Sequence, residues 1–300
     1  MTPSTQDREQ RAATVLDRLS LARTTPYGVA FQPGSANAQL GCYLWAQALS
    51  ASVHPFVGMI EVVLRNAIHR SLSLQVSTQR HVSFPWYDRA TPGAVPLRGK
   101  SLERIEELLS EGSPPVRKAL QPSPDAVVAG LSFGFWPNLL EGLSSRHAPR
   151  TFTDVFQHHP HSKPQHWSHE ANRKALLLRI KRLQQLRNRV CHFEPVWKPH
   201  WFTPSGTLAR HWSQAVAAFR MFHEEMQDLL GWSSPDTVAV YRSSFAWNWF
   251  NTLCTTHAVQ AFMRDHAASG QLMSMGPGLG STPAGPEAQR PASAGLSTSV

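Results

Sequence analysis

The sequence predicts an all-α fold with a substantial core; two observations predict the helices and a third predicts the core. Apolar residues recur three and four positions apart through several long segments, which is the spacing of one face of an α-helix. No segment shows the strict apolar–polar alternation, joined by tight turns, that is typical of β-hairpins. Hydrophobic residues make up 41% of the 300 residues, which is enough for a substantial core.

The first half of the chain divides at its prolines and glycines. An amphipathic helix is expected over 7–22, and a loop at 26–34, where two prolines and two glycines occur. Residues 36–52 have apolar side chains at helical spacing. Pro55 is expected to open a separate helix that runs to about residue 72, because proline is favoured at the first helical position.

The middle of the chain is more interrupted. Residues 77–100 contain three prolines and two glycines and are expected to form a loop, followed by a helix over 102–112. Segment 131–137 allows either a strand or a buried turn between helices. Residues 157–168 are rich in His and Pro and are expected to form a loop.

The last part of the chain returns to helical periodicity. Further helices are expected at 168–193, 208–230 and 237–266. Pro195 ends the first of them, because the residue before a proline resists helical geometry. Residues 269–300 are Gly, Pro, Ser, Ala and Thr with few large apolar groups, so they predict a disordered tail. One helical domain over 1–268 is therefore expected.

Charge and cysteine usage narrow the class of protein. Lys and Arg exceed Asp and Glu by nine and the pI is about 10.0, which suits a polyanionic partner such as RNA or DNA. Cys42, Cys191 and Cys254 are odd in number and form no Cys-x-x-Cys pair, so neither a disulfide framework nor a structural zinc site is expected. No apolar signal core begins the chain, and no stretch looks apolar enough to span a membrane. A reduced, cytoplasmic setting is expected.

The end of the 168–193 helix concentrates the residues that suggest chemistry. Arg187 falls in the middle of the apolar stripe of this helix, where a guanidinium is costly unless it is paired. It therefore requires an anionic or carbonyl partner within the fold, for which Glu61 is a candidate, or a phosphate in a cleft. His192 comes near the helix C-terminus, where the macrodipole favours a protonated ring, although it is equally consistent with a plain helix-terminating residue.

Four segments together resemble a known family. Residues 186–195 read LRNRVCHFEP and closely resemble the signature of Abi-like (abortive-infection) proteins, a bacterial branch of the HEPN superfamily of metal-independent ribonucleases. Three more segments are similar to family helices in the same order, and they lie at 41–50, 60–68 and 132–136. The resemblance spans about residues 10–200. It departs from the family at Phe193, where members often have a second His before Glu-Pro.

The resemblance implies a HEPN-like helical bundle that cleaves RNA in phage defence or as part of a toxin–antitoxin pair. The catalytic residues would be Arg187, Asn188 and His192, with no metal and no cofactor. His192 would act as general base on the ribose 2′-OH, and Arg187 would bind the phosphate. HEPN clefts usually combine two motifs, so a homodimer is expected, with an antitoxin or regulatory protein as a further candidate partner.

Other residues are expected to support this site. Lys181, Arg182 and Arg189 on the same helix would contact RNA. The supporting residues are Glu61, Arg65 and Glu194. The stretch 65–69 echoes the motif, but its Arg-to-His gap is one residue short, so Arg65 and His69 are interpreted as structural.

Two other functions remain open from the sequence. The first is an RNA-binding or regulatory module without catalysis. The second is a metal-dependent hydrolase that uses the histidines at 158, 159, 161, 166 and 169, although that segment contains a proline and no acidic ligand. Tryptophans are expected mainly in the core, namely Trp136, Trp167, Trp197, Trp201 and Trp212.

Overall fold

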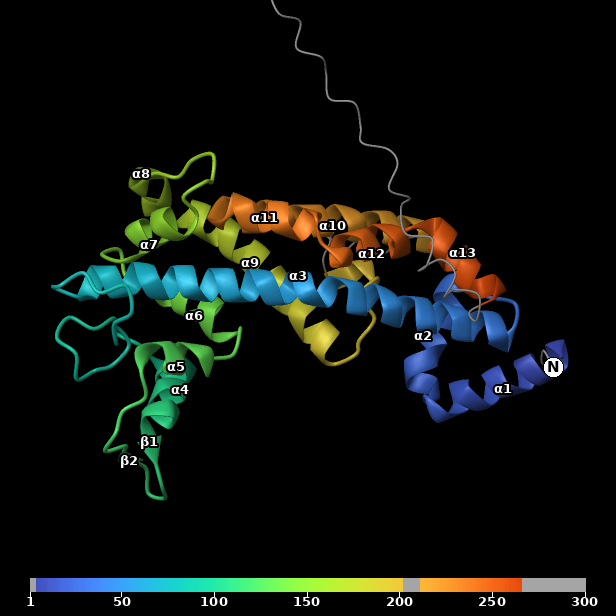
Figure 1. Ribbon diagram of the computed structural model, residues 1–300, viewed down its shortest axis with the longest axis horizontal. Coiled ribbons are helices and arrows are strands. Elements are labelled where there is room, and N and C mark those ends of the chain that lie inside the picture. The colour runs from blue at the N-terminus through green and yellow to red at the C-terminus, as the bar shows by residue number, and fades with distance from the viewer. Residues whose placement is uncertain (1–3, 202–210, 266–300) are drawn as a thin grey trace, which may run out of the picture.

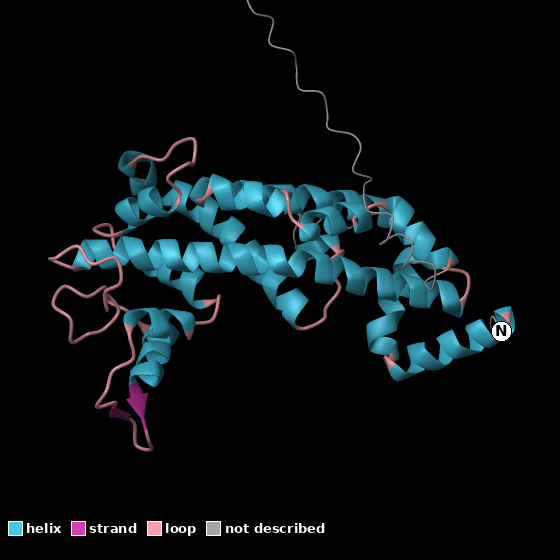
Figure 2. Ribbon diagram, viewed as in Figure 1, coloured by secondary structure: helices cyan, strands magenta, loops and turns pink. Residues whose placement is uncertain are grey.

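A computed structural model describes residues 4–201 and 211–265, and within them the fold is all-α, as predicted. Thirteen α-helices and one pair of two-residue strands are present in these ranges (Figure 2). The expected tail at 269–300 lies outside the described residues. The domain boundary at residue 268 stays a prediction.

A single helix of 41 residues, α3 (Ala36–Val76), runs through the length of the molecule (Figure 1). Its first turn is capped by Ser35, whose hydroxyl accepts the amide of Ala38 at 3.1 Å. The prediction that Pro55 separates two helices is wrong, because Pro55 lies inside α3. A proline removes one helical hydrogen bond, but buried residues on both sides of it, including Val53 and Phe56, hold the helix in the core.

The chain before α3 forms two helices, α1 (Thr5–Arg18) and α2 (Leu21–Phe31). The first covers most of the amphipathic helix expected over 7–22, but it ends at Arg18, and Leu21 already belongs to α2. The loop expected at 26–34 is largely wrong, since α2 continues through Pro26 to Phe31. Phe31 is buried against Trp197, with ring centroids 4.8 Å apart, so tertiary packing overrides the local turn residues.

Beyond α3, residues 77–98 form no helix, as predicted, and a group of short elements covers one end of α3 (Figure 1). These are α4 (Gly99–Leu109), the antiparallel strands β1 (Ser110–Glu111) and β2 (Val116–Arg117), α5 (Pro124–Ala129), α6 (Phe135–Gly142), α7 (Ala148–Val155) and α8 (Pro164–Ser168). The segment left open at 131–137 is a turn that leads into α6. The loop expected at 157–168 is interrupted by the short helix α8, which is little more than one helical turn long.

The remaining helices lie around α3, packed either against it or against one another. They are α9 (Glu170–Cys191), the 3-10 turn η1 (Pro199–Trp201), α10 (Trp212–Ser233), α11 (Pro235–Arg242), α12 (Phe245–Leu253) and α13 (Thr256–Arg264). The single helix expected over 237–266 is instead three helices. Ser244 and Thr255 each accept a backbone amide three residues ahead, so these side chains start new helices.

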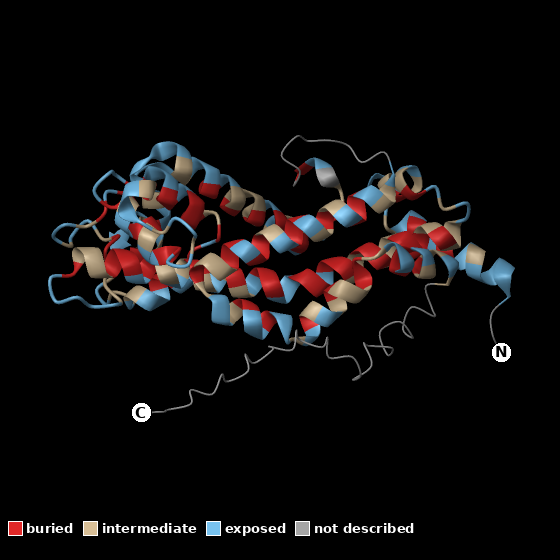
Figure 3. Ribbon diagram, turned by 90° about the horizontal axis from the view of Figure 1, so that it is seen from above, coloured by how far each residue is buried: buried red, intermediate tan, exposed pale blue. Residues whose placement is uncertain are grey.

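The core surrounds α3 and is rich in aromatic rings (Figure 3). Trp136, Trp167, Trp197 and Trp201 are buried, as expected, while Trp212 is half-buried against Phe31. Where α3 meets α13, a glycine permits close approach, because a Cβ on Gly41 would overlap the backbone carbonyl of Phe262.

The expectation that no segment is long and apolar enough to cross a membrane does not hold for α3. By length and composition alone this helix passes that test, with a window of mean hydropathy 1.3. Of that window, 44% is buried inside the protein. A central core helix passes the test in the same way, so the observation is weak evidence for a membrane span.

Candidate functional site

Arg187 lies on the side of α9 that faces α3, and it is paired there. Its Nε is 3.5 Å from Oε2 of Glu61, the acidic partner named as a candidate from the sequence. The two side chains are 32% and 19% exposed, so the pair is partly accessible to solvent. Within the described residues, the Nη groups of Arg187 make no hydrogen bond, so Glu61 engages the guanidinium and leaves its outer fork available.

The exit from α9 has a defined geometry. The amide of Glu194 donates to the carbonyl of Arg189 at 2.8 Å, and the amide of Phe193 donates to Val190 at 3.3 Å. These two bonds form a Schellman motif, with Phe193 in the left-handed region at φ 56°. Arg23 of α2 donates to the carbonyl of Phe193 at 2.9 Å. The exit turn is therefore held both locally and from α2.

That exit places His192 at the end of α9 with its side chain exposed. Asn188 is also exposed, whereas Arg187 is half-buried. At about 100° per residue, Arg187 and His192 point about 140° apart around the helix, and Asn188 points between them. The three side chains are therefore spread over about 140° of the helix surface, and none of the three is sealed inside the protein.

The basic residues expected to bind RNA on α9 are engaged elsewhere in the fold. Lys181 lies 2.9 Å from both carboxylate oxygens of Glu141 in α6. Arg182 is only 12% exposed and lies 2.7 Å from Glu225 of α10. Arg182 therefore contributes to the contact between α9 and α10 rather than to an open phosphate-binding surface.

Arg189 and Glu194 form an ion pair with each other. Their charged atoms are 3.1 Å apart, and the Arg189 guanidinium lies 5.2 Å from the ring centroid of Trp201. Partial burial lowers the pKa of Arg189, an effect that Glu194 opposes. Glu194 thus supports the exit of α9 through Arg189 and not through His192.

Arg65 and His69, which echo the motif on α3, belong to a pocket of about 440 Å³ between α3, the 77–98 loop and α5. His69 is buried, as the structural interpretation requires. Arg65 is half-buried, and its buried Nε has no hydrogen-bond partner. Among the described contacts, no ion pair joins Arg65 to Glu61. Of the two residues expected to hold Arg187 in place, only Glu61 therefore contacts it.

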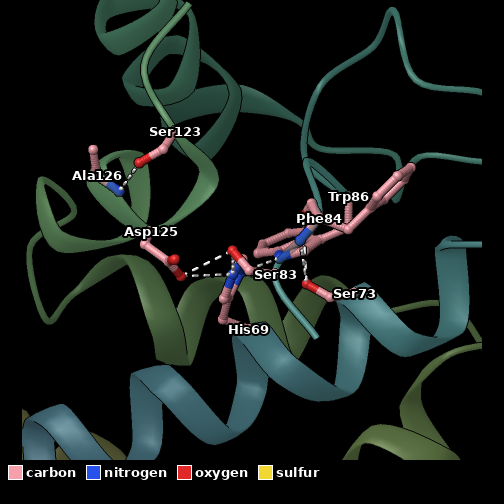
Figure 4. A network of polar contacts seen from close by, with 8 residues as sticks. All are labelled: His69, Ser73, Ser83, Phe84, Trp86, Ser123, Asp125 and Ala126. Carbon is pink, nitrogen blue, oxygen red and sulfur yellow. Dashed lines mark hydrogen bonds and ion pairs between the residues drawn. The ribbon is translucent and has the colours of Figure 1, made fainter. Parts of the chain in front are cut away.

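His69 belongs to a network that the sequence did not reveal (Figure 4). Trp86 donates its indole N–H to Nδ1 of His69 at 2.9 Å, and Nε2 of His69 lies 3.2 Å from the hydroxyl of Ser83. Ser83 donates to Asp125 at 2.9 Å. Burial lowers the pKa of His69, and Asp125 opposes that shift. These partners lie 14–56 positions from His69 in the chain, so no local spacing indicates them.

The histidine-rich segment 157–168 forms an aromatic cluster. The ring centroids of His159, His161 and His166 are 5.2–5.9 Å apart, and His159 and His166 pack on Trp167. In residues 4–201 and 211–265, no group of three or more His, Cys, Asp or Glu side chains converges to hold a metal ion. The described contacts therefore give the metal-dependent alternative no support.

Comparisons with known protein families, with curated proteins and with solved structures found no match to this chain. The assignment of function therefore depends on the motif and on the geometry described above.

Proposed function

We propose that this chain is a metal-independent endoribonuclease of the HEPN type that acts in phage defence or as a toxin in a toxin–antitoxin pair. The supporting observation is that Arg187, Asn188 and His192 lie within six residues at the C-terminal end of α9 and are all at least partly accessible to solvent, with Arg187 paired to Glu61. The proposed setting is the cytoplasm. The proposed substrate is single-stranded RNA.

Arg187 would bind the scissile phosphate. A guanidinium can donate two parallel N–H bonds to two phosphate oxygens, and this fork stabilises the negative charge that grows as the 2′ oxygen attacks phosphorus. The contact with Glu61 involves Nε and limits the rotation of the guanidinium plane. Glu61 is therefore a positioning residue for Arg187.

His192 would take the proton from the ribose 2′-OH. Its exposure at the end of α9 lets a substrate reach the ring. Asn188 would donate a hydrogen bond to the phosphate or hold the His192 ring. As the bond between phosphorus and the 5′ oxygen breaks, that oxygen would take a proton from water, so the products would be a 2′,3′-cyclic phosphate and a 5′-hydroxyl. DNA would survive because it lacks the 2′-OH.

A second copy of the chain would complete the cleft in this proposal. The exposed face at the end of α9 carries Asn188, His192 and the apolar ring of Phe193, which is 66% exposed. A two-fold arrangement would bring two Arg187–His192 sets to one substrate channel. Sedimentation of the full chain tests this arrangement, and a monomer that cleaves RNA at full rate would contradict it.

The decisive experiment is cleavage of labelled single-stranded RNA by the purified full chain in EDTA. The wild-type protein is expected to produce cyclic-phosphate ends and to leave a DNA strand of the same sequence intact. His192→Ala and Arg187→Ala are each expected to reduce the rate by about 10²-fold or more.

Two variants control for the loss of a surface histidine or cation. His257→Ala removes an exposed histidine on α13, and Lys181→Ala removes a cation from α9 itself; both are expected to cleave at the wild-type rate. Cleavage that survives both His192→Ala and Arg187→Ala would refute the proposed chemistry. Salt-sensitive RNA binding without cleavage would instead indicate the non-catalytic RNA-binding alternative.

A further inference from the structure

We propose that the phosphates of the RNA strand bind in two adjoining pockets on the C-terminal half of α3, with Arg70 shared between them. This inference deepens the proposed function and rests on it, because it takes RNA as the ligand. It assigns RNA binding to a different helix from the one that the sequence indicated.

The first of these, the α5-side pocket, has a volume of about 440 Å³. Three side chains of its lining are donors suited to an oxyanion, namely those of Arg65, Asn66 and Arg70, because the hydroxyl of Ser83 already donates to Asp125. The pocket is open to solvent between α3 and α5, and Figure 4 shows His69, Ser83 and Asp125 turned toward one another at its wall.

The second, the α7-side pocket, has a volume of about 530 Å³ and lies between α3, α7 and the start of the 77–98 loop. Three arginines line it, namely Arg70, Arg80 and Arg150. Because Arg70 lines both pockets, the two form one continuous basic track across α3.

Three of the four arginines of this track have no carboxylate partner among the described contacts, whereas Arg150 is paired with Asp154. These three are Arg65, Arg70 and Arg80, and within the described residues the buried Nε of Arg65 has no acceptor. A buried donor without an acceptor is unfavourable until something supplies one, and a phosphate oxygen in the pocket would do so. On α9, by contrast, Lys181, Arg182 and Arg189 each face a glutamate.

Two carboxylates line the track, and both are already engaged. Asp154 lies 3.7 Å from Arg150 and accepts the hydroxyl of Ser71 at 2.8 Å. Asp125 accepts the hydroxyl of Ser83 at 2.9 Å. Four arginines against two carboxylates leave the track with an excess of two positive charges, so the field favours an anion.

The α5-side pocket is suited to binding and not to a serine–histidine reaction. Nδ1 of His69 accepts the indole N–H of Trp86, so the neutral ring carries its proton on Nε2, which faces Ser83. A ring protonated at Nε2 cannot also take the proton of Ser83, as a nucleophilic serine would require. Ser83 and His69 therefore act as fixed polar groups in the wall of the pocket.

One end of the track adjoins the proposed catalytic residues. Arg65 follows Glu61 by one turn of α3 on nearly the same side, and Glu61 is the partner of Arg187. Arg70 lies nine residues beyond Glu61, a rise of roughly 13 Å along the helix, and points roughly 180° away from it around α3. A strand held at Arg187 would therefore meet Arg65 first and would have to pass around α3 to reach Arg70.

The test measures binding apart from cleavage. Full-length His192→Ala protein, which keeps α3 intact, is titrated against fluorescein-labelled single-stranded RNA, with fluorescence anisotropy as the readout. Adding Arg70→Glu or Arg80→Glu is expected to weaken binding by about tenfold or more and to lower the salt slope by about one for each phosphate that is no longer neutralised. Both arginines are exposed, so their replacement should preserve the fold, which circular dichroism checks.

Arg18→Glu on α1 is the matched control, because it makes the same change in net charge at another exposed arginine. It is expected to leave the RNA affinity within about twofold of that of the parent, since salt screens the effect of a charge change that lies far from the bound RNA. Asp125→Asn is expected to strengthen RNA binding, because it removes a negative charge from the track. Equal weakening of binding by Arg18→Glu and Arg70→Glu would overturn the proposal.

The source of the phosphate is tested with separate competitors, inorganic phosphate and a single nucleotide. RNA that is bound through several phosphates should not be displaced by either competitor when the competitor is present at the same concentration as the RNA. Tight binding of the single nucleotide with no RNA binding would overturn the track and leave a small-molecule site. If the wild-type protein cleaves RNA and the Arg70→Glu variant binds RNA as tightly as its parent, the proposed phosphate track is refuted and the nuclease proposal is not.

If Arg70→Glu selectively loses RNA binding and the wild-type protein does not cleave RNA, the nuclease proposal is refuted and the track is not.

Discussion

Replacing Gly41 with alanine is expected to destabilise the protein, although the same change elsewhere in α3 should stabilise it. Gly41 lies where α3 crosses α13, and an added Cβ would overlap the carbonyl oxygen of Phe262 and lie 2.7 Å from its carbonyl carbon. Both atoms belong to the backbone, so no side-chain rotation relieves the overlap. The helices must separate by roughly 1 Å to reach an ordinary contact.

The magnitude follows from two opposing effects. Overpacking of a filled contact costs about 1–3 kcal/mol, and a rigid backbone contact belongs at the upper end of that range. Alanine has a helix propensity about 1 kcal/mol better than that of glycine, which offsets part of the cost. The expected decrease for Gly41→Ala is therefore about 2 kcal/mol in the free energy of unfolding.

Gly58→Ala is the matched control in the same helix. Nothing lies within 4 Å of a Cβ at Gly58, so only the propensity gain of about 1 kcal/mol remains. At about 2–4 °C per kcal/mol, the Tm should fall by about 4–8 °C for Gly41→Ala and rise by about 2–4 °C for Gly58→Ala. Thermal unfolding followed by circular dichroism measures both, and equal stabilisation of the two variants would refute the close crossing of α3 and α13.

The remaining predictions concern the exit of α9, the candidate site and the buried core. Phe193→Gly should raise the unfolding free energy by about 1 kcal/mol in urea denaturation, since φ 56° is unfavourable for an L-residue and the exposed ring contributes little packing; a decrease would show that the ring has a hidden role. Glu61→Gln should change stability by less than about 1 kcal/mol, because the pair is partly exposed, yet slow RNA cleavage by about tenfold or more through a misplaced Arg187. Unchanged cleavage would remove Glu61 from the mechanism. Burial lowers the pKa of His223 to about 3, below its unfolded value, so the unfolded state binds more protons and stability should fall by about 1.4 kcal/mol per pH unit below about pH 6.5. His223→Gln should lose that slope when unfolding is measured at pH 7 and pH 5, and an unaltered slope would assign it to other groups.

Some of the site was predictable because its cause is local. The helical stripe that contains Arg187 and the proline that ends α9 are read from neighbouring residues, so the position of Arg187 on the inner stripe and that of His192 near the helix end follow from local sequence. Glu61 was predicted as a partner of Arg187 because it is an acidic residue on another predicted helix. The structure contains that ion pair.

The prediction that cations of α9 bind phosphate failed to foresee ion pairs whose partners lie far away in the chain. A cation on a helix face looks free in the sequence, but Arg182 meets Glu225 only after the chain has returned 43 positions later. The pocket beside Arg65 depends on Ser83 and Asp125, which come from a loop and a short helix. Their meeting depends on tertiary packing, which helical spacing does not encode.

The sequence by itself therefore determined the all-α class, most helix positions and the half-buried Arg187, because periodicity, caps and prolines act within a few residues. Only the tertiary structure decided that Pro55 lies within one continuous helix and that α2 replaces a loop. It also decided which cations are neutralised and which line open pockets. Those outcomes depend on contacts between segments far apart in the chain, where packing and charge pairing outweigh local preference.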